Sequence, residues 1–219
     1  MEHPILEPMG DFFDRRAADY EEHQIRFVDG GDRMYPFTAS LLPDRPGAEI
    51  LDLGCGSGLE LDAYFPINPT AVVTGVDLSR ELTDLLLKKH ADRAVQVILG
   101  SYFDEEFGEG IYDAAVSVMS LHHFTAARKI PLYQKVKAAL KPDGIFVLTD
   151  YFAPDEEWES RCFSEYERLK RESGLPDGVF YHYDTPLTLE HETDALLAAG
   201  FSEILPRAKW GNTVVLTAK

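Results

Sequence analysis

The stretch ILDLGCGSG, residues 50–58, runs from a short apolar segment directly into a turn that contains three glycines. The pattern predicts a strand over Glu49 to Leu53 and a helix near Leu59 to Tyr64. Glycine allows the backbone to approach a ligand closely, and the start of a helix offers N–H groups without intrahelical partners. The stretch therefore predicts a ligand-binding strand–turn–helix unit, with an ordinary connecting turn as the alternative.

Strand and helix patterns alternate beyond this turn. Short runs rich in Val, Ile and Leu, separated by helical spacing, indicate a parallel sheet that helices cover on both faces. Two last strands have only a short connection, which favours an antiparallel pair. The predicted strands are 49–53, 71–76, 95–99, 112–118, 144–149, 201–205 and 213–218, and the helices between them include 79–90, 125–140 and 189–199. The expected fold class is α/β, a doubly wound sheet of seven mostly parallel strands.

Two parts of the chain lie outside this alternation. Residues 1–43 form an expected N-terminal helical cap, with helices at 11–22 and 34–42 separated by a break at Gly30 and Gly31. Residues 151–186 interrupt the alternation after the fifth strand with a charged helix and an irregular aromatic stretch. Because ligands of doubly wound sheets bind at the carboxyl ends of the strands, we expect this insertion to be a helical lid over the substrate side of one domain, residues 1–219.

Two carboxylates indicate which ligand the turn binds. Asp77 ends the second strand about 20 residues beyond the glycines, where an acidic side chain can accept hydrogen bonds from ribose hydroxyls. Asp52 lies just before the turn, where it would repel a pyrophosphate but attract an ammonium and a sulfonium. The spacing also differs from the G-x-G-x-x-G of dinucleotide sites. S-adenosylmethionine (SAM) is therefore favoured over NAD as the cofactor, with S-adenosylhomocysteine as the product.

Five segments in order resemble the class I SAM-dependent methyltransferases, over essentially the whole chain. They are ILDLGCGSG, VTGVDLS, YDAAVSVMSLHHF, LKPDGIFVLTD and LLAAGF. The resemblance implies a Rossmann-like fold and a SAM site in which Gly54, Cys55 and Gly56 line the methionine moiety and Asp77 holds the ribose. It also implies that Leu78 lies beside the adenine, Ser101 and Tyr102 meet the adenine edge and ring, Val118 lies under the cofactor, and Tyr20 closes over its methionine end. Ser101 departs from the family, where many members have an acidic residue.

The sequence says less about the residues that would bind the methyl acceptor. His122 and His123 follow the fourth strand near the expected acceptor, where a histidine could act as a general base, although a packing role is the simpler reading of this pair. Tyr181 and Tyr183 lie in the insertion and could form an aromatic acceptor pocket. We expect His122, Tyr181 and Tyr183 to bind substrate and assign no catalytic residue. We also expect no metal site, because adjacent histidines do not share a helix face.

Composition limits the partners. The net charge of −17 disfavours a nucleic-acid substrate, and no apolar run is long enough to span a bilayer. The two cysteines suggest no disulfide framework, so a cytoplasmic location is expected. The predicted function is methyl transfer from SAM to a small molecule, and a homodimer is compatible with the sequence. The alternatives are carboxy-SAM synthesis, other SAM chemistry and a non-catalytic SAM-binding protein. The chain also resembles the carboxy-SAM synthases, in which an arginine of the penultimate helix recognises the extra carboxylate; the expected helix 189–199 contains no arginine, which disfavours this alternative.

Overall fold

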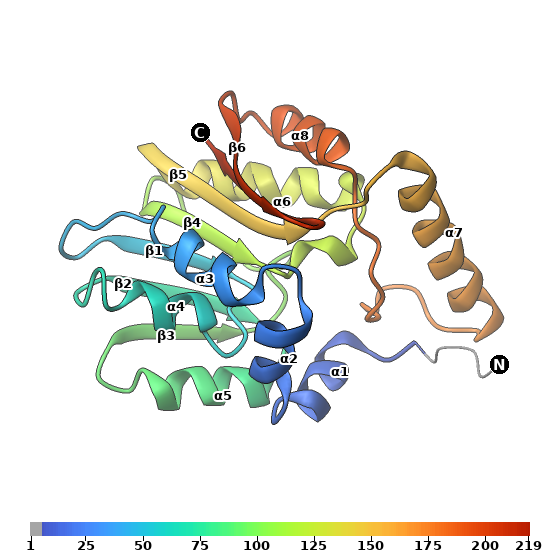
Figure 1. Ribbon diagram of the computed structural model, residues 1–219, viewed down its shortest axis with the longest axis horizontal. Helices are drawn as coiled ribbons and strands as arrows, with labels where there is room; N and C mark the ends of the chain where they lie inside the picture. The colour runs from blue at the N-terminus through green and yellow to red at the C-terminus, as the bar shows by residue number, and fades with distance from the viewer. Residues whose placement is uncertain (1–5) are drawn as a thin grey trace.

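Seven strands form one sheet in the computed structural model, which describes residues 6–219 (Figure 1). The strand order is β3-β2-β1-β4-β5-β7-β6. Strands β1 to β5 pair in parallel, whereas β7 is antiparallel to both β5 and β6. The strands are β1 (Glu49–Leu53), β2 (Val72–Asp77), β3 (Ala94–Leu99), β4 (Tyr112–Val118), β5 (Leu140–Tyr151), β6 (Ile204–Trp210) and β7 (Thr213–Ala218). The predicted doubly wound, seven-stranded, mostly parallel sheet is confirmed.

Helices cover both faces of the sheet, and each face has its own hydrophobic core. Ile50 of β1 packs in one core with residues of α3, α4 and α5, whereas its neighbour Leu51 packs in the other with residues of α6 and α8. This alternation follows from the two-residue period of a strand. These helices are α3 (Gly31–Ala39), α4 (Leu59–Tyr64), α5 (Arg80–Lys89), α6 (Ala126–Ala139) and α8 (Leu189–Ala198). The Ser79 hydroxyl accepts from the Leu82 N–H, which confirms the predicted N-cap of α5.

The N-terminal region differs from the prediction. In place of one helix over 11–22, the chain forms α1 (Met9–Arg16) and α2 (Tyr20–Phe27). No glycine or proline breaks the sequence here; the chain leaves α1 through tight turns, in which the Asp19 N–H donates to the Arg16 carbonyl at 3.1 Å. Packing of α1 against α5 and the insertion therefore overrides the local helical preference.

The insertion after β5 begins with α7 (Glu156–Glu172) and returns through an extended segment to α8 (Figure 1). Leu169 and Tyr181 pack with Leu6 in a small separate core. The insertion leaves and rejoins the domain at adjacent points, because Ala153 and Thr188 form a parallel bridge and the Ala153 N–H donates to the Leu187 carbonyl at 2.9 Å.

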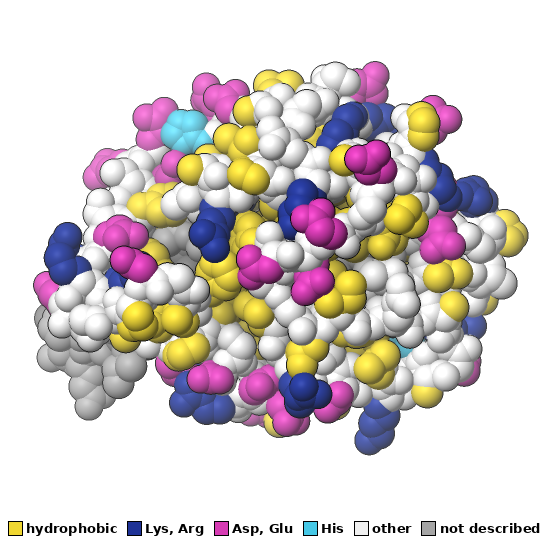
Figure 2. All heavy atoms as spheres, turned by 180° about the vertical axis from the view of Figure 1, so that it is seen from behind, with side chains coloured by type: hydrophobic (Ala, Val, Ile, Leu, Met, Phe, Trp, Pro, Cys, Tyr) yellow, Lys and Arg dark blue, Asp and Glu magenta, His cyan; other side chains and the backbone are white. Residues whose placement is uncertain are grey.

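Charged side chains of both signs are interspersed over the face shown in Figure 2, and Lys and Arg form no continuous patch there. In the part of the chain that the structure describes, none of the helices has both the length and the apolar character that crossing a bilayer requires.

Candidate functional site

The glycine turn lies at the carboxyl end of β1, where the strand order reverses between β1 and β4. Gly54 and Gly56 both adopt positive φ, +75° and +43°. A Cβ atom on Gly54 would lie 2.0 Å from the Ser120 hydroxyl oxygen. Both its backbone conformation and the close approach of Ser120 therefore require glycine at this position.

Asp77 ends β2 beside this turn and accepts two backbone hydrogen bonds. The N–H of Gly56 donates to one carboxylate oxygen and the N–H of Ser79 to the other, each at 2.8 Å. These bonds fix the orientation of the carboxylate and leave further lone pairs on each oxygen. Asp77 can therefore accept hydrogen bonds from two hydroxyl groups of a ligand, as ribose binding requires.

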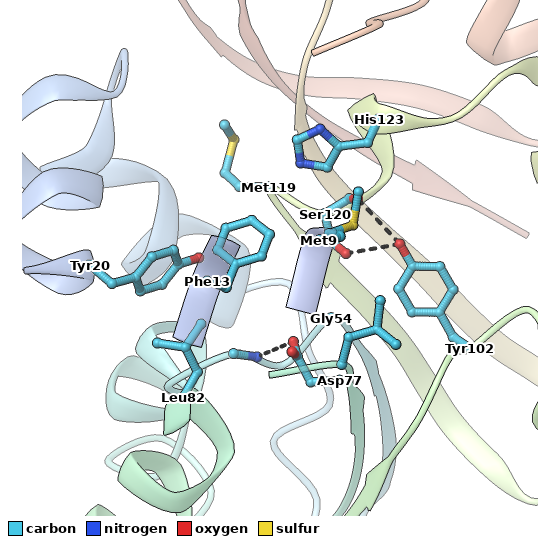
Figure 3. A pocket seen from close by; sticks show the side chains of 12 residues that line it. Met9, Phe13, Tyr20, Gly54, Asp77, Leu82, Tyr102, Met119, Ser120 and His123 are labelled. Carbon is cyan, nitrogen blue, oxygen red and sulfur yellow. Dashed lines mark hydrogen bonds between the residues drawn. The ribbon is translucent and has the colours of Figure 1, made fainter. Parts of the chain in front are cut away.

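The turn and Asp77 border a first cavity, which lies at the carboxyl ends of the parallel strands (Figure 3). Met9 and Phe13 of α1 and Tyr20 of α2 enclose it, so that its free space is about 40 Å³. Its lining residues are Met9, Phe13, Tyr20, Gly54, Gly56, Asp77, Leu78, Leu82, Tyr102, Met119, Ser120 and His123. Because this space is small for a nucleoside, we expect Met9, Phe13 and Tyr20 to shift when a nucleoside binds.

A second cavity of about 360 Å³ lies next to the first. The two cavities share Phe13, Tyr20, Met119 and His123 as a common wall. The second is lined by Phe12, Phe13, Arg16, Asp19, Tyr20, His23, Gln24, Val28, Met119, His122, His123, His182 and Asp184. The site therefore consists of two adjacent compartments, formed by the glycine turn on one side and by α1, α2 and residues 182–184 on the other.

Backbone strain occurs in the shared wall. Met119 has φ +52° and is the only non-glycine residue with positive φ among residues 6–219. It directly follows β4, and its N–H donates to the Thr149 carbonyl at 2.8 Å. Such conformations persist where the surrounding structure holds them and concentrate at functional sites.

Two buried carboxyl groups lie close to the turn, outside the residues that line the cavities. Asp52 is fully buried, and no N–H group among the described residues donates to its carboxylate oxygens, whereas the carboxyl group of Glu60 lies within reach of them. Glu60 of α4 is 4% exposed, and its Oε1 also lacks a partner in this part of the chain. Burial, together with repulsion from Glu60, raises the pKa of Asp52 well above its usual range, and burial raises the pKa of Glu60 to about 7. A pair of this kind favours a cationic group beside it.

His122 lies between two carboxylates. Its Nδ1 is 2.5 Å from Oδ1 of Asp150, which is 2% exposed, and its Nε2 is 3.5 Å from Oδ1 of Asp184. Burial disfavours the imidazolium, but these carboxylates outweigh it and raise the pKa of His122 to about 10. Burial and the charge of His122 instead lower the pKa of His123 to about 3. The two adjacent histidines therefore have opposite electrostatic environments.

The structure brings most of the predicted cofactor residues to the first cavity. Its lining includes Tyr20, Gly54, Gly56, Asp77, Leu78 and Tyr102. Four predicted residues do not line it: Asp52, Cys55, Ser101 and Val118. Cys55 packs inward toward Gly75, and the hydroxyl of Ser101 accepts the Phe103 N–H at 3.2 Å.

The three predicted acceptor residues do not all line the second cavity. His122 lines the second cavity, but the side chains of Tyr181 and Tyr183 do not. They belong to the small core under α7, whereas His182 and Asp184 face the cavity. Alternate residues of an extended segment point to opposite sides, so His182 and Asp184, and not the two predicted tyrosines, face this cavity. No residue of α7 lines either cavity, so the extended segment and not a helical lid borders the site.

Some lining residues were not anticipated. Met9, Phe12 and Phe13 come from α1, and Met119 and Ser120 lie between β4 and the short helix η1 (Leu121–His123). The segment MSLHHF directly follows a predicted strand, which is the position where ligands of such folds bind. Its position could therefore have identified Met119 and Ser120, but nothing local to α1 indicates that its aromatic residues lie over the cofactor side.

Comparison with known proteins relates this geometry to a family. A family model described as a methyltransferase domain matches residues 20–201. The tRNA (carboxymethyluridine(34)-5-O)-methyltransferase of Arabidopsis thaliana is 32% identical over 125 residues, 56% of this chain and 29% of that protein. Nocamycin O-methyltransferase of Saccharothrix syringae is 30% identical over 152 residues, 67% of this chain and 52% of that protein. The chain thus spans 29% and 52% of the length of these two curated relatives.

Solved structures share the fold over nearly the whole chain. One described as a candidate O-methyltransferase from Nostoc punctiforme has a TM-score of 0.70 at 21% identity, covering 98% of this chain and 62% of that one. A DhpI–SAH complex has a TM-score of 0.69 at 16% identity, covering 100% of this chain and 98% of that one.

The sheet order is that of the Rossmann-like methyltransferase fold, and the glycine turn and the acidic residue that ends β2 lie at its ligand-binding edge. The chain belongs to the methyltransferase domain family.

Proposed function

We propose that this enzyme transfers the methyl group of SAM to a small-molecule acceptor held in the second cavity. The observation that carries the proposal is the common wall of Phe13, Tyr20, Met119 and His123. A donor in the first cavity and an acceptor in the second would lie next to each other where the two cavities adjoin. Positioning two reactants in this way can supply most of the catalysis when the donor is already activated.

The residues present fit SAM. Asp77 can hold the ribose hydroxyls, and Leu78 and Tyr102 can contact the adenine. The buried carboxyl pair of Asp52 and Glu60 can balance the ammonium of the methionine moiety, since no N–H group of the described chain donates to Asp52 or to Oε1 of Glu60. When bound, SAM supplies an electrophilic methyl group, whose bond to sulfur breaks as its bond to the acceptor forms.

Two features favour a small acceptor. The second cavity is about 360 Å³, within the range of small-molecule pockets, and α1, α2 and residues 182–184 border it. The net charge of −17 opposes the phosphate contacts on which binding of nucleic acid depends. Transfer to tRNA is the second candidate, because the Arabidopsis relative carries a tRNA methyltransferase name.

Formation of S-adenosylhomocysteine tests the proposal when the enzyme and SAM are incubated with a panel of small hydroxyl, amine and thiol compounds or with unmodified tRNA. We expect turnover with a small molecule and none with tRNA. The matched pair Val28→Phe and Ile25→Phe locates the acceptor, because Val28 lines the second cavity and Ile25 is 44% exposed. Val28→Phe should reduce turnover at least tenfold without changing SAM affinity, and Ile25→Phe should change neither. Methylation of tRNA alone, or full turnover in Val28→Phe, would contradict the proposal.

A further inference from the structure

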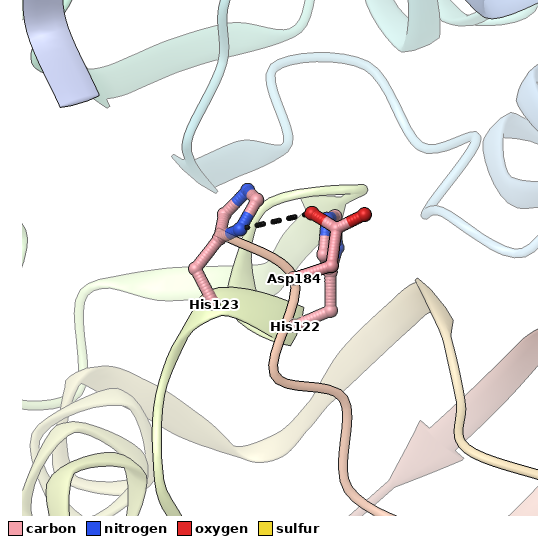
Figure 4. Close-up of side chains that lie close together, drawn as sticks. All are labelled: His122, His123 and Asp184. Atoms are coloured by element: carbon pink, nitrogen blue, oxygen red, sulfur yellow. Dashed lines mark ion pairs between the residues drawn. The ribbon is translucent and has the colours of Figure 1, made fainter. Parts of the chain in front are cut away.

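Three potential metal ligands meet at the second cavity, although the two histidines are adjacent in sequence (Figure 4). Oδ1 of Asp184 lies 3.5 Å from Nε2 of His122 and 3.4 Å from Nδ1 of His123. All three ligand atoms lie within 4.8 Å of one another. The expectation that adjacent histidines cannot share a site assumed an α-helix. In the short helix η1 the two ring centroids lie 4.0 Å apart, and both side chains reach Asp184.

Without an ion these separations are those of ion pairs, and they also fit metal coordination. An N–H···O hydrogen bond spans roughly 2.7–3.2 Å, which is shorter than both separations. Two ligand atoms about 2.1 Å from a tetrahedral metal ion lie roughly 3.4 Å apart. Nδ1 of His123 also makes a 3.1 Å hydrogen bond with the carbonyl oxygen of Tyr183, which an ion bound at this nitrogen would replace.

Further contacts hold the His122 side chain in place. Oδ1 of Asp150 contacts Nδ1 of His122 at 2.5 Å, which leaves Nε2 directed toward Asp184. A metal ion bound at Nε2 would displace the proton that His122 carries in the metal-free protein. Asp150 is itself fixed by the N–H groups of Leu121 and Tyr151, each at 2.9 Å. A histidine that binds a metal through one nitrogen usually donates its other N–H to a carboxylate or carbonyl in this way.

We propose that His122, His123 and Asp184 bind a divalent transition-metal ion at the second cavity. Two imidazoles and one carboxylate suit Zn²⁺, Co²⁺, Mn²⁺ or Fe²⁺, whereas Mg²⁺ and Ca²⁺ prefer oxygen ligands throughout. Three protein ligands leave a coordination position open. All three residues line the second cavity, and His123 also borders the first.

The open position suggests which acceptors the cavity takes, an extension that rests on the proposed function. A hydroxyl group of the acceptor bound to the ion would lose its proton to solvent more readily, because the ion stabilises the oxygen's negative charge. The O–H electron pair stays on the metal-bound oxygen. The acceptor class is therefore an oxygen nucleophile that can coordinate a metal, such as a hydroxyl beside a carbonyl or carboxylate.

Calorimetric titration of the chelator-treated full chain with Zn²⁺ tests the site, and Co²⁺ provides a visible absorption band that reports coordination. We expect one ion per chain for both metals and no comparable binding of Mg²⁺. Asp184→Asn and His123→Ala should each weaken Zn²⁺ binding at least tenfold, and both leave the pair of His122 and Asp150 intact. Asp177→Asn is the matched control, because Asp177 is in the same segment with its side chain 97% exposed, and it should bind as the wild type does.

Circular dichroism establishes that each variant is folded. Absence of Zn²⁺ and Co²⁺ binding in the wild type, or equal affinity in Asp184→Asn, would overturn the proposal and identify the cluster as an ion pair only. Titration of the metal-free chain with S-adenosylhomocysteine separates this result from the proposed function. Binding of S-adenosylhomocysteine without binding of metal would refute only the metal site. Binding of metal without binding of S-adenosylhomocysteine would refute only the proposed methyl transfer.

Discussion

The N–H of Met9 donates a hydrogen bond to the carbonyl oxygen of Phe180 at 2.8 Å, which joins α1 to the extended part of the insertion. Two residues farther along the insertion, the ring of His182 stacks on Phe12 with centroids 3.4 Å apart. Met9 also borders the first cavity, and His182 borders the second. The two segments that cover the site are therefore in direct contact with each other.

From this contact we predict that SAM slows amide hydrogen exchange in α1 and in residues 180–184 together. Cofactor entry must displace Met9 and Phe13, and closure over the bound cofactor then protects both segments. Exchange measured by mass spectrometry with and without S-adenosylhomocysteine checks this, with the buried strand β4 as the internal reference. His182→Ala should reduce the protection of α1. Protection of one segment while the other is unchanged would contradict the coupling.

Replacement of Asp77 by Ala is expected to weaken SAM binding at least tenfold. The variant loses two charge-assisted hydrogen bonds to ribose, each worth roughly 1.5–3 kcal/mol. Asp84→Ala is the matched control, since Asp84 is an exposed acid of the neighbouring helix α5. Calorimetry on both variants gives the comparison. If both variants bind SAM equally well, Asp77 does not contact the cofactor.

Gly54→Ala is expected to destabilise the protein and to impair SAM binding. Its positive φ costs an alanine roughly 1–2 kcal/mol, and the new Cβ would lie 2.0 Å from the Ser120 hydroxyl oxygen. The second substitution Ser120→Gly removes this clash but not the backbone strain, so the double variant should recover part of the stability. Urea unfolding of the four proteins of this cycle measures the coupling. Additive effects would show that the clash is relieved in another way.

Glu60 is expected to make SAM affinity depend on pH. Because burial raises the pKa of Glu60 to about 7, the carboxylate that can pair with the methionine ammonium forms as the pH rises through 7. Binding of S-adenosylhomocysteine should tighten several-fold from pH 6 to pH 8. Binding of 5′-methylthioadenosine, which lacks the ammonium, should not change, and Glu60→Gln should remove the dependence. The same slope for both ligands would place Glu60 away from the methionine end.

The same pKa shift predicts how ligand-free stability varies. The pKa of Glu60 is higher in the folded protein than in the unfolded chain. Its contribution to the free energy of unfolding is therefore full below about pH 4.3 and is lost as the pH rises to about 7. The urea midpoint of the wild type should therefore fall between pH 5 and pH 8 more than that of Glu60→Gln. An equal fall in both proteins would assign the pH dependence to other groups.

The parts of the site that the sequence predicts are those whose geometry is local. Gly54, Gly56 and Asp77 follow directly from two strands and the turns at their ends. Met9 of α1 and Asp184 of the insertion are far from the glycine turn in sequence. They reach the site only through long-range packing, which no local pattern encodes. The residues of segment 180–184 that line the cavity differ from the predicted tyrosines for a related reason, because the sequence alone does not show which of two alternating sides faces the cavity.

The bridge between Ala153 and Thr188 makes the insertion a nearly closed loop that starts and ends at one place on the domain. A segment of this kind can change in length or composition with little effect on the loop-closure cost, which grows only slowly with length. Exchange of residues 154–187 would thus alter the side of the second cavity that carries His182 and Asp184 while the glycine turn and Asp77 stay in place. Under the proposed function, such an exchange would change acceptor choice while the methyl donor stays the same.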